Sequence, residues 1–332
     1  MADPVVLDRW DATDVRLSDV LNALSELRRS SPRNATGTAC SSLIAIASND
    51  EEAYRALQAM RRLGVQHPAR FVLVRQELSD LDAVGGIDAK VTLYGGMAGE
   101  HPVTFSDITL VVRGRAAEHL DFMIEPFTLP DLPVVVWYPG ALPPVSEPLL
   151  RMAHAVLVDT KEAGDPQVLT DLIMLAGRRV VVDLSWARLR PWRELLAALF
   201  DGPDYLPFAS GVTSIEMYGK PTPRHLLAGW LSSRLSVPRT HVHLHDARHV
   251  SVRIMASSGG RQARFAALRS GEEHLVRASA TIEGGPSHQE LLPLPDDSLA
   301  SSLSHALGHL DRDPVWEAAI GTAVSLATAT AV

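Results

Sequence analysis

The chain has 332 residues and a mass of 36.0 kDa, which predicts two domains at about 150 residues per domain. Hydrophobic residues make up 46% and charged residues 21%, and these ordinary fractions exclude a disordered or collagen-like chain. The formal net charge of -8 argues against general binding to nucleic acid or anionic membranes, because those polyanions repel an acidic protein.

The cysteine content and the lack of a targeting pattern favour a cytoplasmic location. The one cysteine, Cys40, excludes an intrachain disulfide and a four-cysteine zinc site. We interpret it as a small buried residue at a strand start, with pairing to another chain as the alternative. Residues 1–4 lack the basic-then-apolar pattern of a signal peptide, and no apolar run reaches the ~18 residues that a bilayer requires. We therefore expect a cytoplasmic protein that does not contact membranes.

Residues 1–40 are predicted to form an N-terminal helical arm. Leu17, Val20, Leu21, Leu24 and Leu27 follow the i, i+3, i+4, i+7 spacing of an amphipathic helix. The polar stretch 30–34, which contains a proline, is expected to end that helix.

Residues 41–178 are predicted to form an α/β domain around an open, mostly parallel sheet. A strand at 40–47, a helix at 49–63 and a strand at 70–74 predict a βαβ unit. Further strands are expected at 90–95, 108–112, 134–137 and 156–158, with helices at 116–125 and 166–176. This alternation of strands and helices is typical of an open α/β sheet.

Residues 179–332 are predicted to form an α+β domain. It opens with a strand at 180–183, followed by helices at 191–200 and 224–235 and a strand at 213–218. Residues 241–245, 250–255, 263–268 and 275–282 then alternate in the β manner at the spacing of antiparallel hairpins. A helical region is expected to close the chain.

The motifs of common enzymes are absent from the sequence. No G-x-G-x-x-G, phosphate-binding P-loop, H-E-x-x-H, C-x-x-C or G-x-S-x-G pattern occurs, and the glycines at 95–99 have the wrong spacing. The sequence therefore predicts no catalytic residues and no cofactor. His241, His243 and His245 would share one face of a strand and could bind zinc there, but we favour the alternative in which Val242 and Leu244 face the core and the histidines face solvent.

An unusual segment, residues 183–193, contains two of the six tryptophans and three arginines. Tryptophan and arginine are enriched at the energetic centres of protein interfaces, and arginine binds carboxylate or phosphate in a bidentate manner. The functional interpretation is a partner-binding surface or an anion site at the junction of the two halves. The alternative is that the tryptophans are core residues with arginines around them. The candidate residues are Trp186, Arg188, Arg190, Trp192 and Arg193.

A second segment, residues 132–140, is a buried strand that ends in Trp137 and Tyr138 before a Pro-Gly turn. Ligands of open α/β sheets bind at the carboxyl ends of the strands, which makes the aromatic pair a further candidate for partner binding. The alternative is a plain core strand.

These two segments resemble the OpcA family, the glucose-6-phosphate dehydrogenase assembly proteins. The resemblance lies in the Pro-Val strand from Pro133 to Gly140 and in the Asp-Leu-Ser-Trp-Ala-Arg-Leu-Arg-Pro-Trp-Arg stretch from Asp183 to Arg193, within a match over much of residues 40–255. The chain departs from the family pattern at Ala187 and Arg190, where threonine is expected, and at Tyr138, where tryptophan is expected.

The resemblance implies a non-enzymatic role. A family member is expected to bind glucose-6-phosphate dehydrogenase, favour its active oligomer and support the oxidative pentose phosphate pathway, with no cofactor of its own. The alternative is a sugar-phosphate-binding sensor or an enzyme of the same pathway without a known motif, and a small sugar-phosphate effector is compatible with both.

Overall fold

A computed structural model of the chain describes residues 4–29, 39–67, 69–78, 85–269, 275–294 and 298–330. Contacts divide the chain into two compact units, and each unit is built from three separate segments. The first unit contains Met1–Asp159, Arg178–Val182 and Ser298–Asp311, and the second contains Thr160–Gly177, Asp183–Asp297 and Arg312–Val332. The division into domains 1–40, 41–178 and 179–332 remains a prediction.

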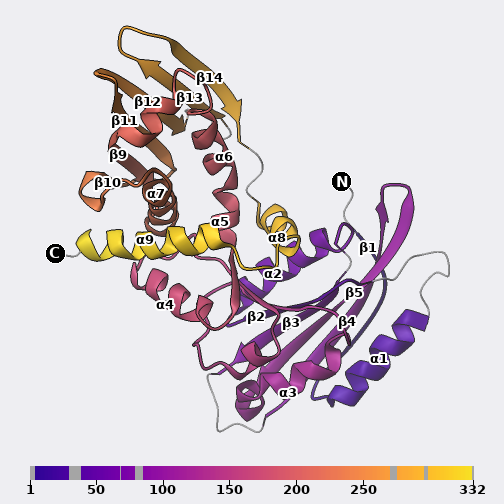
Figure 1. Cartoon of the computed structure of the whole chain (residues 1–332). Coiled ribbons are helices and arrows are strands. Elements are labelled where there is room, and N and C mark those ends of the chain that lie inside the picture. The colour runs from indigo at the N-terminus through magenta and orange to yellow at the C-terminus, as the bar shows by residue number, and fades with distance from the viewer. Residues whose placement is uncertain are drawn as a thin grey trace. The chain divides into compact units, whose positions relative to one another are not determined.

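The first unit is built on an open eight-stranded sheet in the order β1-β4-β5-β3-β2-β6-β7-β8 (Figure 1). The central pairs β5–β3, β3–β2, β2–β6 and β6–β7 are parallel, whereas β1–β4 and β4–β5 are antiparallel. The predicted open, mostly parallel sheet is thus confirmed. The strands are β1 (Val5–Ala12), β2 (Ser42–Ala47), β3 (Arg70–Glu77), β4 (Ile87–Ala98), β5 (His101–Arg113), β6 (Val134–Tyr138), β7 (Ala155–Val158) and β8 (Val180–Asp183).

The βαβ unit that the sequence predicts is present as β2, α2 (Asp50–Leu63) and β3. Every residue of β2 is buried, as expected for a strand covered on both faces. The side chain of Asn49 accepts a hydrogen bond from the Glu52 amide at 2.9 Å and so caps the N-terminus of α2. The local sequence signals and the fold agree here.

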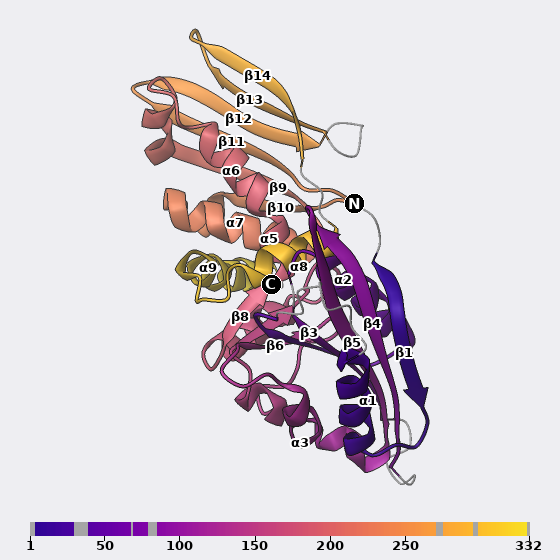
Figure 2. The same ribbon diagram turned by 90° about the vertical axis from the view of Figure 1, so that its right-hand side faces the viewer.

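The N-terminal region differs in part from the predicted helical arm. Residues 5–12 form β1, which pairs antiparallel with β4 at the edge of the sheet (Figure 2). The helical spacing at 17–27 does predict α1 (Leu17–Arg29) correctly, and α1 contacts β4 and β1. Residues 30–38, where the helix was expected to be broken, lie outside the described residues. The expectation that Cys40 is buried at a strand start is wrong: Cys40 is exposed and lies two residues before β2 begins at Ser42.

The helix expected at 116–125 is broken into short turns. Residues Gly114–Glu118 and Glu125–Phe127 are 3-10 helices, and only α3 (Leu120–Ile124) is an α-helix. His119 has a non-helical backbone (φ -125°, ψ 45°), and Pro126 cannot donate a helical hydrogen bond. A single α-helix therefore cannot continue through these two positions.

The second unit contains a six-stranded sheet in the order β10-β9-β11-β12-β13-β14. The pairs from β9 through β11, β12, β13 and β14 are antiparallel, which confirms the predicted hairpins. The strands are β9 (Val212–Gly219), β10 (Val242–Asp246), β11 (Ser251–Ser258), β12 (Arg261–Arg269), β13 (Leu275–Ile282) and β14 (Ser287–Pro293), the last of which the sequence analysis missed.

One strand of this sheet differs from the expected hairpin. β10 pairs parallel with β9, because α7 (Pro221–Leu235) connects the two strands as a helical crossover. The other helices of the unit are α4 (Gln167–Ala176), α5 (Leu184–Arg188), α6 (Arg190–Ala198) and α9 (Pro314–Thr330), while α8 (Leu299–Leu307) belongs to the first unit. None of the described helices is long and apolar enough to cross a bilayer.

Aromatic rings pack the C-terminal end of α6 against the sheet of the second unit. Phe200, which follows α6, stacks on Phe265 of β12 with ring centroids 4.1 Å apart. Tyr205 and Phe208 meet the same ring edge-on at 6.1 and 6.4 Å. This packing fixes the end of α6, whose first residues belong to the segment at 183–193, called the Trp/Arg segment from here on.

Helices α7 and α9 approach each other closely at a glycine. A Cβ atom at Gly229 of α7 would overlap the carbonyl oxygen of Ala319 and lie 2.8 Å from the Ala323 nitrogen, both on α9. Both obstacles are backbone atoms, which cannot rotate away. The absence of a side chain at residue 229 therefore sets the distance between the two helices.

We predict that Gly229→Ala destabilises the protein by about 1–3 kcal/mol, because the added methyl group forces the α7 and α9 backbones apart. The matched control is Gly321→Ala on α9, where a Cβ atom meets nothing within 4 Å. That change should be neutral or stabilising, since alanine favours helix over glycine. Urea unfolding of both variants checks this, and equal stabilities would contradict the close approach.

Candidate functional site

The Trp/Arg segment forms two consecutive short helices: α6 is the helix expected at 191–200, and α5 precedes it without having been predicted. Asp183, which is 1% exposed, caps α5 by accepting a hydrogen bond from the Ser185 amide at 2.9 Å. The same carboxylate accepts from the Thr160 hydroxyl at 2.8 Å. One buried acid thus fixes the start of the segment.

The indole of Trp186 is hydrogen-bonded to a carboxylate from the C-terminal segment of the second unit. Its indole Nε1 donates to Oδ2 of Asp313 at 2.8 Å, and its side chain is buried. The other oxygen of Asp313 accepts from the Val315 and Trp316 amides at 2.9 and 3.1 Å and so caps α9. Asp313 therefore connects the Trp/Arg segment to the N-terminus of α9.

Arg193 lies over the ring of Trp186. Its guanidinium carbon lies 3.6 Å from the centroid of the indole ring, and Nη1 donates to the Trp186 carbonyl at 2.7 Å. Burial lowers the pKa of the Arg193 guanidinium to about 10, although the negative charge of Asp313 acts to raise it. The group therefore stays protonated at neutral pH. Trp186 and Arg193 thus support the segment from within.

The remaining candidate residues of the segment lie in two environments, a cavity and the exposed surface. Trp192 is buried, and with half-buried Arg188 it lines a cavity. Arg190, at the start of α6, is exposed and pairs with Glu194 one helical turn later at 2.7 Å. Both tryptophans are therefore buried, as in the alternative that the sequence analysis left open, and the exposed candidate is Arg190.

The cavity has a volume of about 350 Å³, and all of its lining residues belong to the second unit. The segment α5–α6 forms one wall, and the others come from the loop before α4, the start of α7, the loop before β11 and the end of β12. The lining residues are Lys161, Glu162, Ser185, Arg188, Leu189, Trp192, Lys220, Pro223, Arg248, His249, Val250 and Arg269.

Positive charge dominates this cavity. Five lining residues are lysine or arginine and one is glutamate, so the formal charge is +4 when His249 is counted as neutral. Lys220 pairs with Glu162, and the Thr222 hydroxyl donates to the Ala163 carbonyl at 3.0 Å, which ties the loop before α4 to the start of α7. A concave site with this charge is complementary to an anion.

Only part of this cavity could be predicted from the sequence. Arg188 and Trp192 were candidates, but Lys161, Lys220, Arg248 and Arg269 were missed, because these four residues are spread over more than a hundred positions of the sequence. No local pattern marks such residues, because only the topology of the second unit brings them together.

The aromatic pair at the end of β6 lies in the first unit. Trp137 is fully buried and Tyr138 is 8% exposed, and the indole nitrogen and the phenol oxygen have no hydrogen-bond partner. Burial raises the pKa of the Tyr138 phenol above its ordinary value, so the group stays neutral. Both residues act as core side chains, and their part in partner binding stays a prediction.

The three histidines at 241–245 lie at the end of a short 3-10 helix and on β10. His241, His243 and His245 are exposed while Val242 and Leu244 are partly buried, which fits the alternative that the sequence analysis favoured. His245 stacks on Tyr218 with centroids 4.6 Å apart. Among the residues that the structure describes, no group of three histidine, cysteine, aspartate or glutamate side chains is placed to hold a metal ion.

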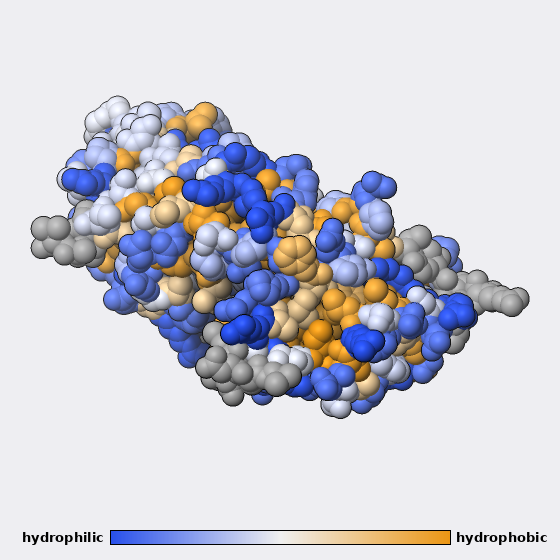
Figure 3. All heavy atoms as spheres, turned by 90° about the horizontal axis from the view of Figure 1, so that it is seen from below, coloured by the Kyte–Doolittle hydropathy of each residue, from blue (hydrophilic) through white to orange (hydrophobic). Residues whose placement is uncertain are grey.

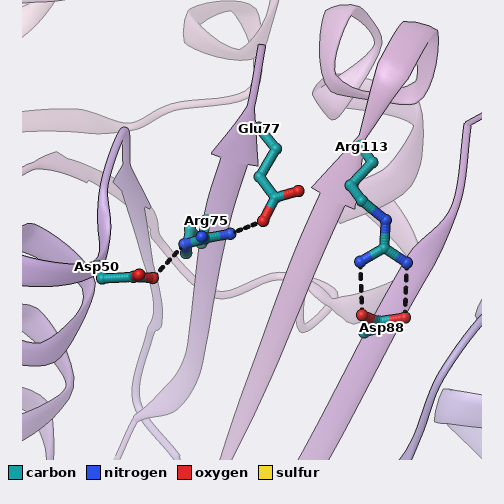
Figure 4. Close-up of polar contacts among 5 residues, drawn as sticks. All are labelled: Asp50, Arg75, Glu77, Asp88 and Arg113. Atoms are coloured by element: carbon teal, nitrogen blue, oxygen red, sulfur yellow. Dashed lines mark hydrogen bonds and ion pairs between the residues drawn. The ribbon is translucent and has the colours of Figure 1, made fainter. Parts of the chain in front are cut away.

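Two arginines of the first unit, Arg75 and Arg113, form ion pairs on and between β3, α2, β5 and β4 (Figure 4). Arg75 of β3 reaches Asp50 at the start of α2 and Glu77 on its own strand. Arg113 of β5 forms a bidentate pair with Asp88 of β4 at 2.5 and 2.8 Å. Hydrogen bonding from Arg113 lowers the pKa of the Asp88 carboxyl. These pairs join the ends of secondary-structure elements and are best explained as structural.

Two family models match this chain, one in each half. The model described as the glucose-6-phosphate dehydrogenase subunit N-terminal domain matches residues 60–173, and the one described as the C-terminal domain of that subunit matches residues 179–320. The chain belongs to the OpcA family. The resemblance that residues 133–140 and 183–193 carry is confirmed, since both segments lie inside the matched regions.

Curated relatives match over part of their length. The OxPP cycle protein OpcA of Synechocystis sp. is 30% identical over 161 residues, which cover 45% of this chain and 34% of the relative. The protein of that name from Nostoc punctiforme is 30% identical over 164 residues, or 45% of this chain and 35% of the relative. The match thus spans about a third of the length of these relatives.

Solved structures resemble the OpcA-family chain only remotely. An oxidoreductase from Sinorhizobium meliloti gives a TM-score of 0.41 at 9% identity, with 87% of this chain and 97% of that chain covered. A likeness of this size supports no statement about chemistry.

We predict that Asp313→Ala destabilises the chain by about 2 kcal/mol, since it removes both the cap of α9 and the acceptor of the Trp186 indole. Trp186→Phe removes only the indole donor and should cost less. Thermal unfolding of the two single variants and the double variant measures this. Strict additivity of the two effects would contradict a shared interaction.

We predict that Asp88→Asn lowers stability at neutral pH, by about 1 kcal/mol, and that the loss shrinks in acid. The folded-state pKa of Asp88 lies below its unfolded value, so the pair stabilises the protein above the unfolded pKa and is lost as pH falls through the folded pKa. Chemical denaturation of both proteins between pH 7 and pH 3 checks this, and a pH-independent difference would contradict it.

Proposed function

We propose that this chain is a non-enzymatic activator and assembly factor that binds glucose-6-phosphate dehydrogenase and favours its active oligomer. The observation that carries the proposal is the match of both halves to models described as parts of a glucose-6-phosphate dehydrogenase subunit. The name of the relatives, OxPP cycle protein, supports the same pathway. A cytoplasmic location and a contribution to NADPH supply are part of this proposal, since they follow from the partner enzyme.

A binding protein activates an enzyme only through differential affinity. It must bind the active oligomer more tightly than the inactive form, because equal affinity for both forms shifts no equilibrium. A coupling free energy of ~1–3 kcal/mol changes the partner's substrate affinity several-fold to about a hundredfold. No bond-making chemistry is required of the chain itself, which agrees with the lack of catalytic motifs in its sequence.

The surface offers both kinds of contact that a protein partner requires. Exposed apolar side chains include Val5, Phe122 and Leu206, which are 66%, 70% and 60% exposed. Hydrophobic residues also gather on one face of the molecule (orange in Figure 3). Arg190 supplies an exposed cation within the Trp/Arg segment, and we propose that buried Trp186, Trp192 and Arg193 hold that segment in shape.

We predict that Arg190→Glu weakens binding to the dehydrogenase about tenfold or more, because the change reverses an exposed charge in the proposed interface. Arg55→Glu is a matched control: the side chain of Arg55 is 52% exposed against 51% for Arg190, and each arginine pairs with a glutamate four residues away. Binding is measured by titration of labelled dehydrogenase, and its oligomeric mass by light scattering.

The activator role can also be tested by mixing the purified chain with glucose-6-phosphate dehydrogenase. Adding the chain should increase the mass of the dehydrogenase complex and change its apparent KM for glucose 6-phosphate. If neither quantity changes under several salt and substrate conditions, the activator role is wrong. If a complex forms but its kinetics do not change, activation is wrong and only a scaffolding role remains.

A second candidate is a sugar-phosphate-binding sensor or an enzyme of the same pathway. The cationic cavity of the second unit favours this candidate over a featureless binding module. The enzyme version requires turnover of a pentose-phosphate intermediate by the isolated chain. The sensor version requires a rise in Tm with ligand and without any partner.

A further inference from the structure

We propose that the cavity of the second unit is a phosphoryl-binding site for a small phosphorylated metabolite, with Ser185 and Arg269 as its hydrogen-bonding residues. The proposal deepens the sensor candidate by naming its site and its ligand chemistry. It does not depend on the dehydrogenase, because ligand binding can be measured on this chain alone.

The cavity lining carries an excess of positive charge. It concentrates a formal charge of +4, with the pair of Lys220 and Glu162 included in the sum, in a chain whose net charge is -8. A concave site with this charge attracts anions, and it attracts a dianion more strongly than a single carboxylate.

A buried hydroxyl group in the cavity lining lacks a hydrogen-bond partner. Ser185 is 2% exposed, lines the cavity, and its Oγ has no hydrogen-bond partner in the structure. Its backbone is fixed at the start of α5, since its amide donates to Asp183 and its carbonyl accepts from Leu189. A buried hydroxyl without a partner is costly, and a ligand oxygen in the cavity would satisfy it.

A third observation concerns Arg269 at the end of β12. Its Nε is also buried without a hydrogen-bond partner, and the residue lines the same cavity. A guanidinium group donates only, so its partner must be an acceptor. A phosphoryl group carries three acceptor oxygens and about two negative charges at neutral pH, which matches both the charge and the donors of this site.

The apolar lining residues restrict the rest of the ligand. Leu189, Trp192, Pro223 and Val250 line the same cavity as the cations and are apolar. A volume of about 350 Å³ is at the lower end of the range for small-molecule sites. The ligand class is therefore a phosphate ester of a small organic body, of the size of a sugar phosphate.

The experiment is isothermal titration of the full chain with inorganic phosphate, glucose 6-phosphate and glucose at constant ionic strength, alongside thermal unfolding with each. We expect saturable binding of the two phosphates and none of glucose. Equal affinities would mean that the phosphoryl group alone is recognised. Tighter binding of glucose 6-phosphate would mean that the cavity also contacts the rest of the ligand. Absence of saturable binding of both phosphates, or equal binding of glucose, overturns the proposal.

Ser185→Ala separates a ligand site from a structural role. The variant should bind phosphate about tenfold more weakly, while its unliganded Tm stays equal or rises because an unpartnered hydroxyl has been removed. Ser232→Ala is the matched control, since Ser232 is 4% exposed, its Oγ also has no partner, and it does not line the cavity. It should leave phosphate affinity unchanged.

Arg269→Met tests the charge and the Nε donor together. We expect a loss of at least tenfold in phosphate affinity, whereas Arg264→Met on the exposed side of the same strand should have no effect. If Ser185→Ala and Arg269→Met both bind phosphate like the unmodified chain, the bound anion lies elsewhere and the proposal is wrong. Loss of dehydrogenase binding with intact phosphate binding would instead count only against the activator role.

Discussion

The carboxylate of Asp313 is the interaction on which the candidate site depends. One oxygen caps α9 and the other holds the indole of Trp186, so a single side chain fixes two elements that are 127 residues apart in the chain. Trp186 then lies between this acceptor and the guanidinium of Arg193. Because α5 and α6 are anchored in this way, Arg188 and Trp192 have fixed positions in the cavity wall and Arg190 has a fixed position at the surface.

The sequence predicted those parts of the fold whose signals are local. The cap at Asn49, the buried strand at 134–138 and the alternation of β11 to β13 each follow from residues within one element, and the structure has them. Strand β1 was missed because it depends on pairing with β4, and the crossover that makes β10 parallel depends on where α7 packs. Long-range pairing leaves no periodic signal in the strand itself.

The candidate site was predictable to the same limited extent. Residues 183–193 stood out by composition, and that segment does form one wall of the cavity. Its tryptophans, however, are buried supports, which composition alone cannot distinguish from interface anchors. The cations at 161, 220, 248 and 269 come from four loops or strand ends, so their common location became visible only with the fold.

The chain passes repeatedly between its two compact units, and this has a consequence for work with fragments. A cut at residue 178 would separate β8 and α8 from the sheet and unit to which they belong, and it would separate α4 from α9, which it contacts. Neither half of the polypeptide is therefore a self-sufficient folding module, although each half matches its own family model. Shortened versions of this protein should be designed around spatial neighbours instead of a single point along the chain.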